Sequence, residues 1–154
     1  MKRCLICLIA LCTTACTKVE EIRIPYRPVY LELDLAFEDK GLLELYSHRI
    51  YTPNDKTLLA IEKTGFGGVL VFHGMDIGFG TYQAYDAACP FEAKANTVVA
   101  VEDDIYAVCP VCGSRYDLTA GGIPAPGSAS TYRLHRYNVQ PAASSVGSKL
   151  IVGN

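Results

Sequence analysis

The sequence predicts an all-β domain, built as a small sandwich or barrel. Short apolar segments recur along the chain from Val29 onward, and turn-forming stretches such as residues 65–68, 102–104 and 121–127 separate them. No segment after Tyr46 shows a helical period of ten residues or more, and a length of 154 residues is typical of one domain. Repeated short strands with frequent turns are characteristic of sandwiches and barrels.

The strands follow in order along the chain. The first is predicted at residues 29–35, where VYLELDL alternates strictly between apolar and polar side chains. Residues 37–46 are left open between a short helix and a turn, because their leucine spacing suits both. Seven further strands are predicted at residues 57–62, 69–73, 81–86, 97–101, 105–108, 132–139 and 149–152.

Residues 1–15 have the organisation of an export signal. Lys2 and Arg3 provide the positive start, CLICLIALC is an apolar run, and Thr-Thr-Ala supplies the small residues before a cut. The apolar run is shorter than the roughly 20 residues that span a bilayer. We therefore expect this segment to be removed on export.

The sequence Thr-Thr-Ala-Cys16 resembles a bacterial lipoprotein processing site, with Thr13 where leucine is usual. The resemblance implies that Cys16 is diacylated and anchors the protein to a membrane of the bacterial cell envelope, on the periplasmic side or in the outer membrane. The alternative is an ordinary secretory peptide cut nearby. Residues 17–28 are polar and contain two prolines, so residues 16–28 are predicted to be a lipidated N-terminus and tether in front of a domain at 29–154.

Charge and cysteine content narrow the function. Without residues 1–15, which contain two basic residues and no acid, 12 basic face 16 acidic side chains, a net charge of −4 that argues against a nucleic-acid partner. Only Cys89, Cys109 and Cys112 then remain in the domain, and an odd number excludes a framework of disulfides alone. Cys109-Pro-Val-Cys112-Gly has a metal-ligand spacing, because the glycine permits the tight turn that turns both thiolates toward one ion. A disulfide within the turn, or two buried thiols, are the alternatives.

The order of these motifs resembles the Rieske iron–sulfur family. Cys-Pro-Phe at 89–91 is followed by Cys-Pro-Val-Cys-Gly-Ser-Arg-Tyr-Asp at 109–117, a Gly/Pro-rich loop at 121–127 and a strand at 134–139. In that family, Cys-x-His and Cys-x-x-His loops hold a [2Fe-2S] cluster, with cysteines on one iron and histidines on the other. The resemblance implies a Rieske-like small β-sandwich or barrel with two cluster-binding loops and a proline-rich covering loop.

Carried over by position, Cys89 and Cys109 match the cysteine ligands of the cluster. Ser114 and Tyr116 match the serine and tyrosine that donate hydrogen bonds to cluster sulfur in that family. These four residues are the part of the pattern that the chain retains.

Both histidine positions are substituted. Phe91 stands at the first and has no metal-binding atom, while Cys112 stands at the second and would bind as a thiolate, which lowers a redox potential relative to imidazole. Glu92 is the candidate for a fourth ligand, and a solvated loop carboxylate is the alternative. Asp86 is a weaker candidate. The histidines of the domain lie outside both loops and are expected to be ordinary surface or strand residues: His48, His73 and His135.

Two functions follow. The first is an envelope electron-transfer or redox protein with a [2Fe-2S] cluster, or another metal, held by Cys89, Cys109, Cys112 and Glu92, acting with another envelope protein. The second is a fold that has lost the cluster and serves as a structural or binding module, stapled by zinc or by a Cys109–Cys112 disulfide, which an oxidising compartment favours. We do not expect an enzyme acting alone, because the chain has no length for a separate catalytic domain and no nucleophile elbow, zincin helix or phosphate-binding loop.

Overall fold

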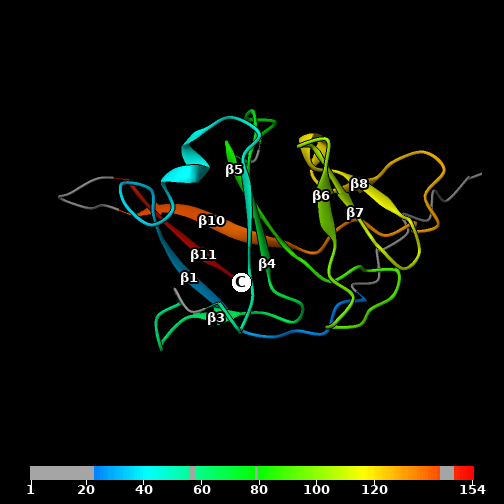
Figure 1. Cartoon of the computed structure of the whole chain (residues 1–154), viewed down its shortest axis with the longest axis horizontal. Helices are drawn as coiled ribbons and strands as arrows, with labels where there is room; N and C mark the ends of the chain where they lie inside the picture. Colours follow the sequence, from blue (N-terminus) through cyan, green and yellow to red (C-terminus); the bar gives the residue numbers. More distant parts are fainter. Residues whose placement is uncertain (1–22, 56–57, 79, 143–147) are drawn as a thin grey trace, which may run out of the picture.

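The computed structural model describes residues 23–55, 58–78, 80–142 and 148–154, and this part of the chain is nearly all β (Figure 1). All pairings between its named strands are antiparallel. The predicted all-β class is confirmed.

The larger sheet has seven strands and curls into a nearly closed, barrel-like shape (Figure 1). Its strand order is β2-β4-β5-β10-β11-β1-β3. The bounds are β1 (Val29–Asp34), β2 (His48–Tyr51), β3 (Lys63–Thr64), β4 (Val69–His73), β5 (Tyr82–Asp86), β10 (Arg136–Ala142) and β11 (Lys149–Gly153).

The smaller sheet is inserted between two neighbouring strands of the larger one. The chain leaves the large sheet at the end of β5, forms the small sheet, and returns in β10, which pairs with β5. Figure 1 places the small sheet on the right of the large one. Its order is β6-β7-β8-β9, with bounds β6 (Ala100–Glu102), β7 (Tyr106–Val108), β8 (Arg115–Asp117) and β9 (Ile123–Pro124), and the 3-10 helix η2 (Leu118–Ala120) follows β8.

Two hydrophobic clusters share strand β4. Val69 and Val71 pack in the interior of the large sheet, whereas Leu70 and Phe72 pack toward the small sheet. A strand that is buried on both faces needs apolar side chains at every position, which explains the unbroken apolar run in β4. By contrast, β1 alternates between buried and half-buried side chains, as its sequence predicts.

Most predicted strands are confirmed, with shifted ends at residues 97–101 and 132–139, where the strands are β6 and β10. The open segment at 37–46 contains the 3-10 helix η1 (Lys40–Leu43). The strand predicted at 57–62 is wrong: residues 58–62 form turns and irregular structure, and the short β3 follows them. The apolar Leu59 and Ile61 there are 58% and 64% exposed, so no neighbouring sheet buries them. The strands β2, β3, β8 and β9 were not predicted.

Candidate metal centre

Three thiols meet at the junction of the two sheets. Cys89 follows β5, whereas Cys109 and Cys112 follow β7. The three Sγ atoms all lie within 4.8 Å of one another, and those of Cys89 and Cys112 are 3.7 Å apart. Cys89 and Cys109 are buried, Cys112 is half-buried, and all three are free thiols. The structure therefore brings together the three cysteines that the sequence analysis selected, in a group that could hold a metal ion.

The second loop is a tight turn held by its own backbone. The Gly113 N–H donates to the Cys109 carbonyl at 3.0 Å, and the Cys109 N–H donates to the Ser114 carbonyl at 2.9 Å. Gly113 has φ of +68°, in the left-handed region where a side chain would be strained. This turn brings Cys109 and Cys112 to the same side.

The first loop is fastened at both ends. The Cys89 N–H donates to the Thr97 carbonyl, and the Ala93 N–H donates to the Cys89 carbonyl at 2.8 Å. Ala88 also forms an isolated bridge with Val98. The loop therefore closes on itself and presents the Cys89 thiol toward the second loop.

Asp86, at the end of β5, holds the start of the first loop through hydrogen bonds to its carboxylate. Its carboxylate is fully buried and accepts hydrogen bonds from the backbone N–H groups of Phe66, Gly67 and Ala88, and from the Tyr137 hydroxyl at 2.6 Å. All these donors occupy the carboxylate, so the weak ligand candidate Asp86 instead holds the backbone that leads to Cys89.

Gly67 belongs to the same support. A Cβ atom added at Gly67 would lie 2.5 Å from the Cβ of Ala88, which is closer than two carbon atoms approach. The absence of a side chain at this position lets the 66–67 backbone reach the Asp86 carboxylate.

Two hydroxyl groups contact the sulfur atoms. The Tyr116 hydroxyl lies 3.2 Å from Cys89 Sγ, and Ser114 Oγ lies 3.1 Å from Cys112 Sγ. The Ser130 N–H donates to Ser114 Oγ at 3.0 Å, which orients that hydroxyl. Ser114 and Tyr116 thus lie where the sequence analysis expected them, next to sulfur, and Ser130 is a supporting residue that the sequence analysis missed.

The thiols differ in acidity. Burial, the largest effect, raises the pKa of Cys89 to about 11, although hydrogen bonds from Tyr116 and the Glu92 backbone oppose it. Burial also acts to raise the pKa of Cys112, but hydrogen bonds from Ser114 and contact with the other two thiols outweigh it, so this pKa lies below the ordinary thiol value. Burial and the contact with Cys89 raise the pKa of Tyr116, which keeps it a neutral donor. Of Cys89 and Cys112, Cys112 therefore ionises more readily.

The structure does not bring Glu92 together with the thiols. Its carboxylate pairs with Lys94 at 3.5 Å and is not a member of the group whose ligand atoms lie within 4.8 Å. Phe91 is 37% exposed beside the site. Two histidines have ordinary ring contacts, His73 stacking on Tyr82 and His135 meeting the edge of another aromatic ring.

The Gly/Pro-rich segment at 121–127 and the residues just after it contact the second cysteine loop and the strand that follows it. Residues 123–124 form β9 and pair with β8, and the Ser128 hydroxyl bonds the backbone of Arg115. The contact with the cysteine turn comes from Ser130, three residues beyond the predicted covering loop at 121–127.

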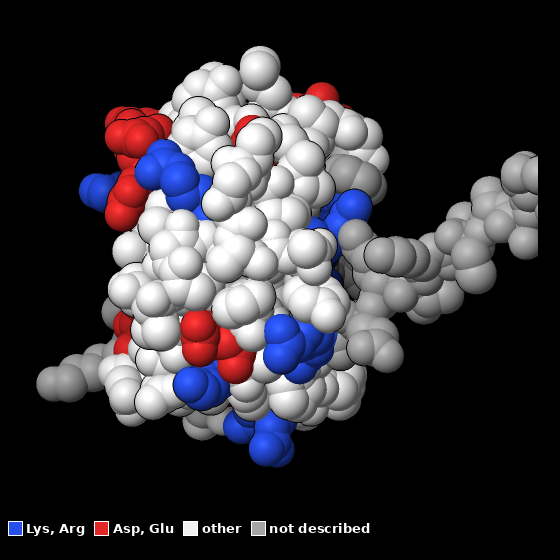
Figure 2. All heavy atoms as spheres, turned by 90° about the vertical axis from the view of Figure 1, so that its right-hand side faces the viewer, with Lys and Arg blue, Asp and Glu red and all other residues white. Residues whose placement is uncertain are grey.

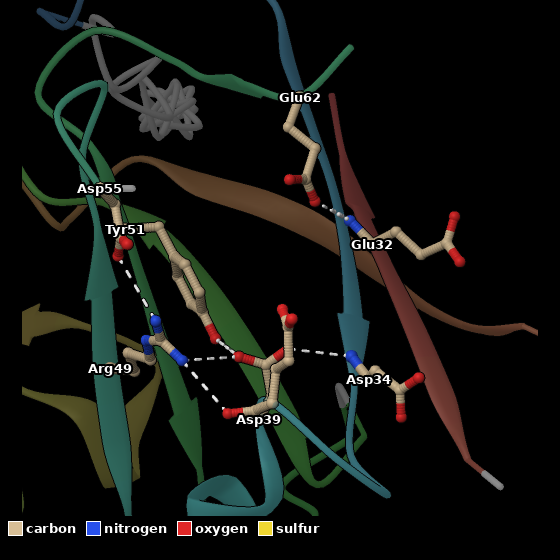
Figure 3. Close-up of polar contacts among 8 residues, drawn as sticks. Glu32, Asp34, Asp39, Arg49, Tyr51, Asp55 and Glu62 are labelled. Carbon is tan, nitrogen blue, oxygen red and sulfur yellow. Dashed lines mark hydrogen bonds and ion pairs between the residues drawn. The ribbon is translucent and has the colours of Figure 1, made fainter. Parts of the chain in front are cut away.

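A second acid-rich region, between the first strands of the large sheet, is committed to structural contacts (Figure 3). The Asp39 carboxylate accepts hydrogen bonds from Arg49 and Tyr51 on one oxygen and from the Asp34 N–H on the other. Glu62 accepts from two backbone N–H groups. These contacts hold the loops between β1, β2 and β3, so the Asp39 and Glu62 carboxylates act there as structural acceptors.

The segment in front of β1 lies on the domain. Arg23 donates to the Phe91 carbonyl at 2.8 Å and stacks over the Tyr132 ring at 5.1 Å, and Ile24 is only 4% exposed. Gly65 N–H donates to the Pro28 carbonyl. Residues 23–28, which the sequence analysis assigned to the tether, therefore pass along the folded surface. The predicted signal at 1–15 and the lipidation site Cys16 lie outside the described residues.

Charged side chains surround an uncharged middle on the molecular surface beside the small sheet. Figure 2 views the side on the right of Figure 1, and Lys, Arg, Asp and Glu lie in its lower part, at its upper left margin, at its top and at its right beside the grey atoms. Within the described ranges, no helix has the length and apolar character needed to cross a membrane.

Comparisons with known proteins give no family for the chain. No model of a known protein family matches it, and neither does any curated protein sequence. The function must therefore be inferred from the site.

Proposed function

We propose that this protein is a metal-binding domain of the bacterial cell envelope, in which Cys89, Cys109 and Cys112 hold a single thiol-seeking metal ion such as zinc. The observation that carries the proposal is the mutual approach of three thiols from two separate loops. Thiolates with this spacing are the preferred ligands of zinc and of iron in tetrahedral sites.

The sulfur spacing supports one ion. In a tetrahedral site with metal–sulfur bonds of about 2.3 Å, two sulfur atoms lie about 3.8 Å apart. The Cys89–Cys112 separation of 3.7 Å has this value, and Cys109 lies within 4.8 Å of both. Little movement would bring all three sulfurs to a common ion.

Three protein ligands leave a fourth position on a tetrahedral ion. Closed structural sites have four protein ligands, whereas sites with three hold water or another molecule in the fourth position. Because Glu92 is engaged with Lys94 and Cys112 is half-buried, the fourth position would open on the Cys112 side to an exogenous ligand. The ion would also join the two loops, and hence the two sheets.

The test is metal analysis of the protein purified without added metal, followed by cobalt substitution. Three thiolates on tetrahedral Co²⁺ produce strong sulfur-to-cobalt charge-transfer absorption in the near ultraviolet. Cys112→Ser should lose this absorption and most of the bound metal. Cys16→Ser, which removes a cysteine outside the site, should retain both, and equal metal content in the two variants would reject the proposal.

A [2Fe-2S] cluster is the second candidate. Its support is the pair of hydroxyls beside the sulfurs, Tyr116 at Cys89 and Ser114 at Cys112, in the arrangement that the Rieske resemblance implies. The single-ion proposal is preferred because a cluster spreads its ligands over two irons, so thiols on different irons lie further apart than thiols on one. In the cluster case, the protein would pass electrons to another envelope protein.

Anaerobic reconstitution with iron and sulfide separates the two candidates. Stoichiometric iron and sulfide with a low-temperature EPR signal after reduction would favour the cluster. Zinc or iron without sulfide would favour the single ion.

The envelope location is proposed from Cys16. Its test is incorporation of labelled palmitate by the wild-type protein, with Cys16→Ser as the control that should incorporate none. Equal labelling of both proteins would reject the anchor.

A further inference from the structure

Residues 23 and 24 attach the N-terminal segment next to the thiol site. The Arg23 guanidinium bonds the carbonyl of Phe91, two residues after Cys89, and lies over the ring of Tyr132. Ile24 is buried. Within the described residues, the chain therefore contacts the domain first at the first cysteine loop, ahead of β1.

This attachment shortens the leash, by which we mean the free chain between the lipid anchor at Cys16 and the first residue fixed on the domain. Seven residue steps separate Cys16 from Arg23, and they span at most about 25 Å when fully extended. If the leash ran free to Val29, its thirteen steps would span about 45 Å. A folded domain of about 130 residues is roughly 35 Å across, so the shorter leash cannot reach around it.

The surface next to the attachment suits an interfacial contact. Phe91 is 37% exposed and Val111 is 64% exposed, and they lie in the first and second cysteine loops respectively. Because the thiols of these loops are within 4.8 Å of one another, the two apolar side chains flank the same site. The middle of the side that lies on the right of Figure 1 is also free of charged side chains, although the exposed Lys94 and its partner Glu92 follow Phe91 in the first cysteine loop (Figure 2). The affinity of a surface for the membrane interface grows with the apolar area that enters it, so exposed apolar side chains at this end favour the contact.

We propose that the cysteine end of the domain faces the phospholipid bilayer, with Phe91 and Val111 in contact with its headgroup region. The inference rests on the lipid anchor at Cys16 from the proposed function. In this orientation the Cys112 side of the site opens toward the membrane surface, and a molecule that reaches the bound metal must come from the bilayer or along it.

The test uses the absence of tryptophan from the whole sequence. Phe91→Trp and Val111→Trp each introduce a single reporter at the cysteine end. Met75→Trp is the matched control, because Met75 is 59% exposed and lies in the β4–β5 hairpin, at the opposite end of β5 from Cys89. The lipidated full chain is reconstituted into phosphatidylethanolamine–phosphatidylglycerol vesicles whose acyl chains carry bromine close to the headgroup end, where it quenches tryptophan that enters the membrane interface.

Tryptophan introduced at position 91 or 111 should show a blue shift and a loss of emission in these vesicles, and tryptophan introduced at position 75 should show neither. Equal quenching at 75 and 91 would overturn the proposal. A linker of about twelve Gly/Ser residues inserted after Ile22 lengthens the leash and should reduce the difference between the two positions. An undiminished difference would overturn the leash as its cause.

Flotation and metal content of the same preparations distinguish this inference from the function on which it rests. Protein that binds metal but does not float with the vesicles would overturn the membrane orientation and leave the metal site standing. Protein that floats without binding metal would reject the metal site alone.

Discussion

The buried Asp86 carboxylate allows a quantitative test of how the first cysteine loop is held. One of its oxygens accepts from Gly67 and Ala88 N–H groups at 3.1 and 2.8 Å, and the other from the Phe66 N–H at 3.0 Å and the Tyr137 hydroxyl at 2.6 Å. Every donor points at a negative oxygen. In Asp86→Asn, an amide N–H₂ must replace one oxygen and therefore faces donors in either orientation.

The expected cost follows from counting these bonds. In the better of the two orientations, the new amide nitrogen faces Tyr137, whose oxygen can accept, but the Phe66 N–H is left unpaired. An unpaired buried donor costs about 1–3 kcal/mol, and the loss of charge on the remaining bonds adds about 1 kcal/mol each. Both side chains are buried, so water does not weaken these hydrogen bonds. We therefore expect Asp86→Asn to lower the free energy of unfolding by about 3–5 kcal/mol, and Tyr137→Phe to lower it by about 1.5–3 kcal/mol.

Urea unfolding at neutral pH, followed by circular dichroism in a Cys16→Ser background, measures these changes. The exposed Asp104→Asn is the control and should change the free energy by less than about 0.5 kcal/mol. In the double variant, Tyr137→Phe should cost less than it does alone, because the charge that it bonds is already gone. An Asp86→Asn variant as stable as the control, or strictly additive effects, would refute this account of the loop.

Three further outcomes are expected. In the metal-free protein, iodoacetamide should modify the half-buried Cys112, whose pKa is lowered, well before the buried Cys89, whose pKa is about 11. Peptide mass spectrometry measures the two modification rates at about pH 7 to 9, and equal rates would contradict this. Oxidised glutathione should join Cys89 to Cys112, since their Sγ atoms are 3.7 Å apart, and two glutathione thiols are released as the bridge forms; a bridge within the Cys-x-x-Cys turn would refute this pairing. Gly67→Ala should lower stability in urea by about 1–3 kcal/mol, because its Cβ would lie 2.5 Å from that of Ala88, whereas Gly41→Ala, with open space around it, should not.

The strand predictions succeeded where burial follows a local period. The alternation in β1 predicted a strand with one buried face, and the apolar run of β4 predicted a strand without showing that two different cores bury its two faces. The strand predicted at 57–62 failed because Leu59 and Ile61 have strand-forming neighbours in sequence but no sheet beside them in space. Composition cannot distinguish these two situations.

The support of the site left no recognisable pattern in the sequence. Ser130 reaches Ser114 across sixteen residues, and Asp86 reaches Tyr137 across 51. Arg23 reaches Phe91 across 68 residues from within a segment whose composition is that of a linker. Single polar residues of these kinds are common in loops, so only their spatial neighbours identify them.

The prediction of short strands and turns, and of the Cys109–Cys112 turn with its glycine, came from the sequence alone, because alternation, turn chemistry and thiol spacing are local properties of a chain. The tertiary structure decided which of the potential metal ligands come together. It brought Cys89 to 3.7 Å from Cys112 and kept the Glu92 carboxylate with Lys94. The physical reason is that these distances depend on how the small sheet is set between β5 and β10, and that placement is determined by burial on both faces of β4 and β5, far from the second cysteine loop in sequence.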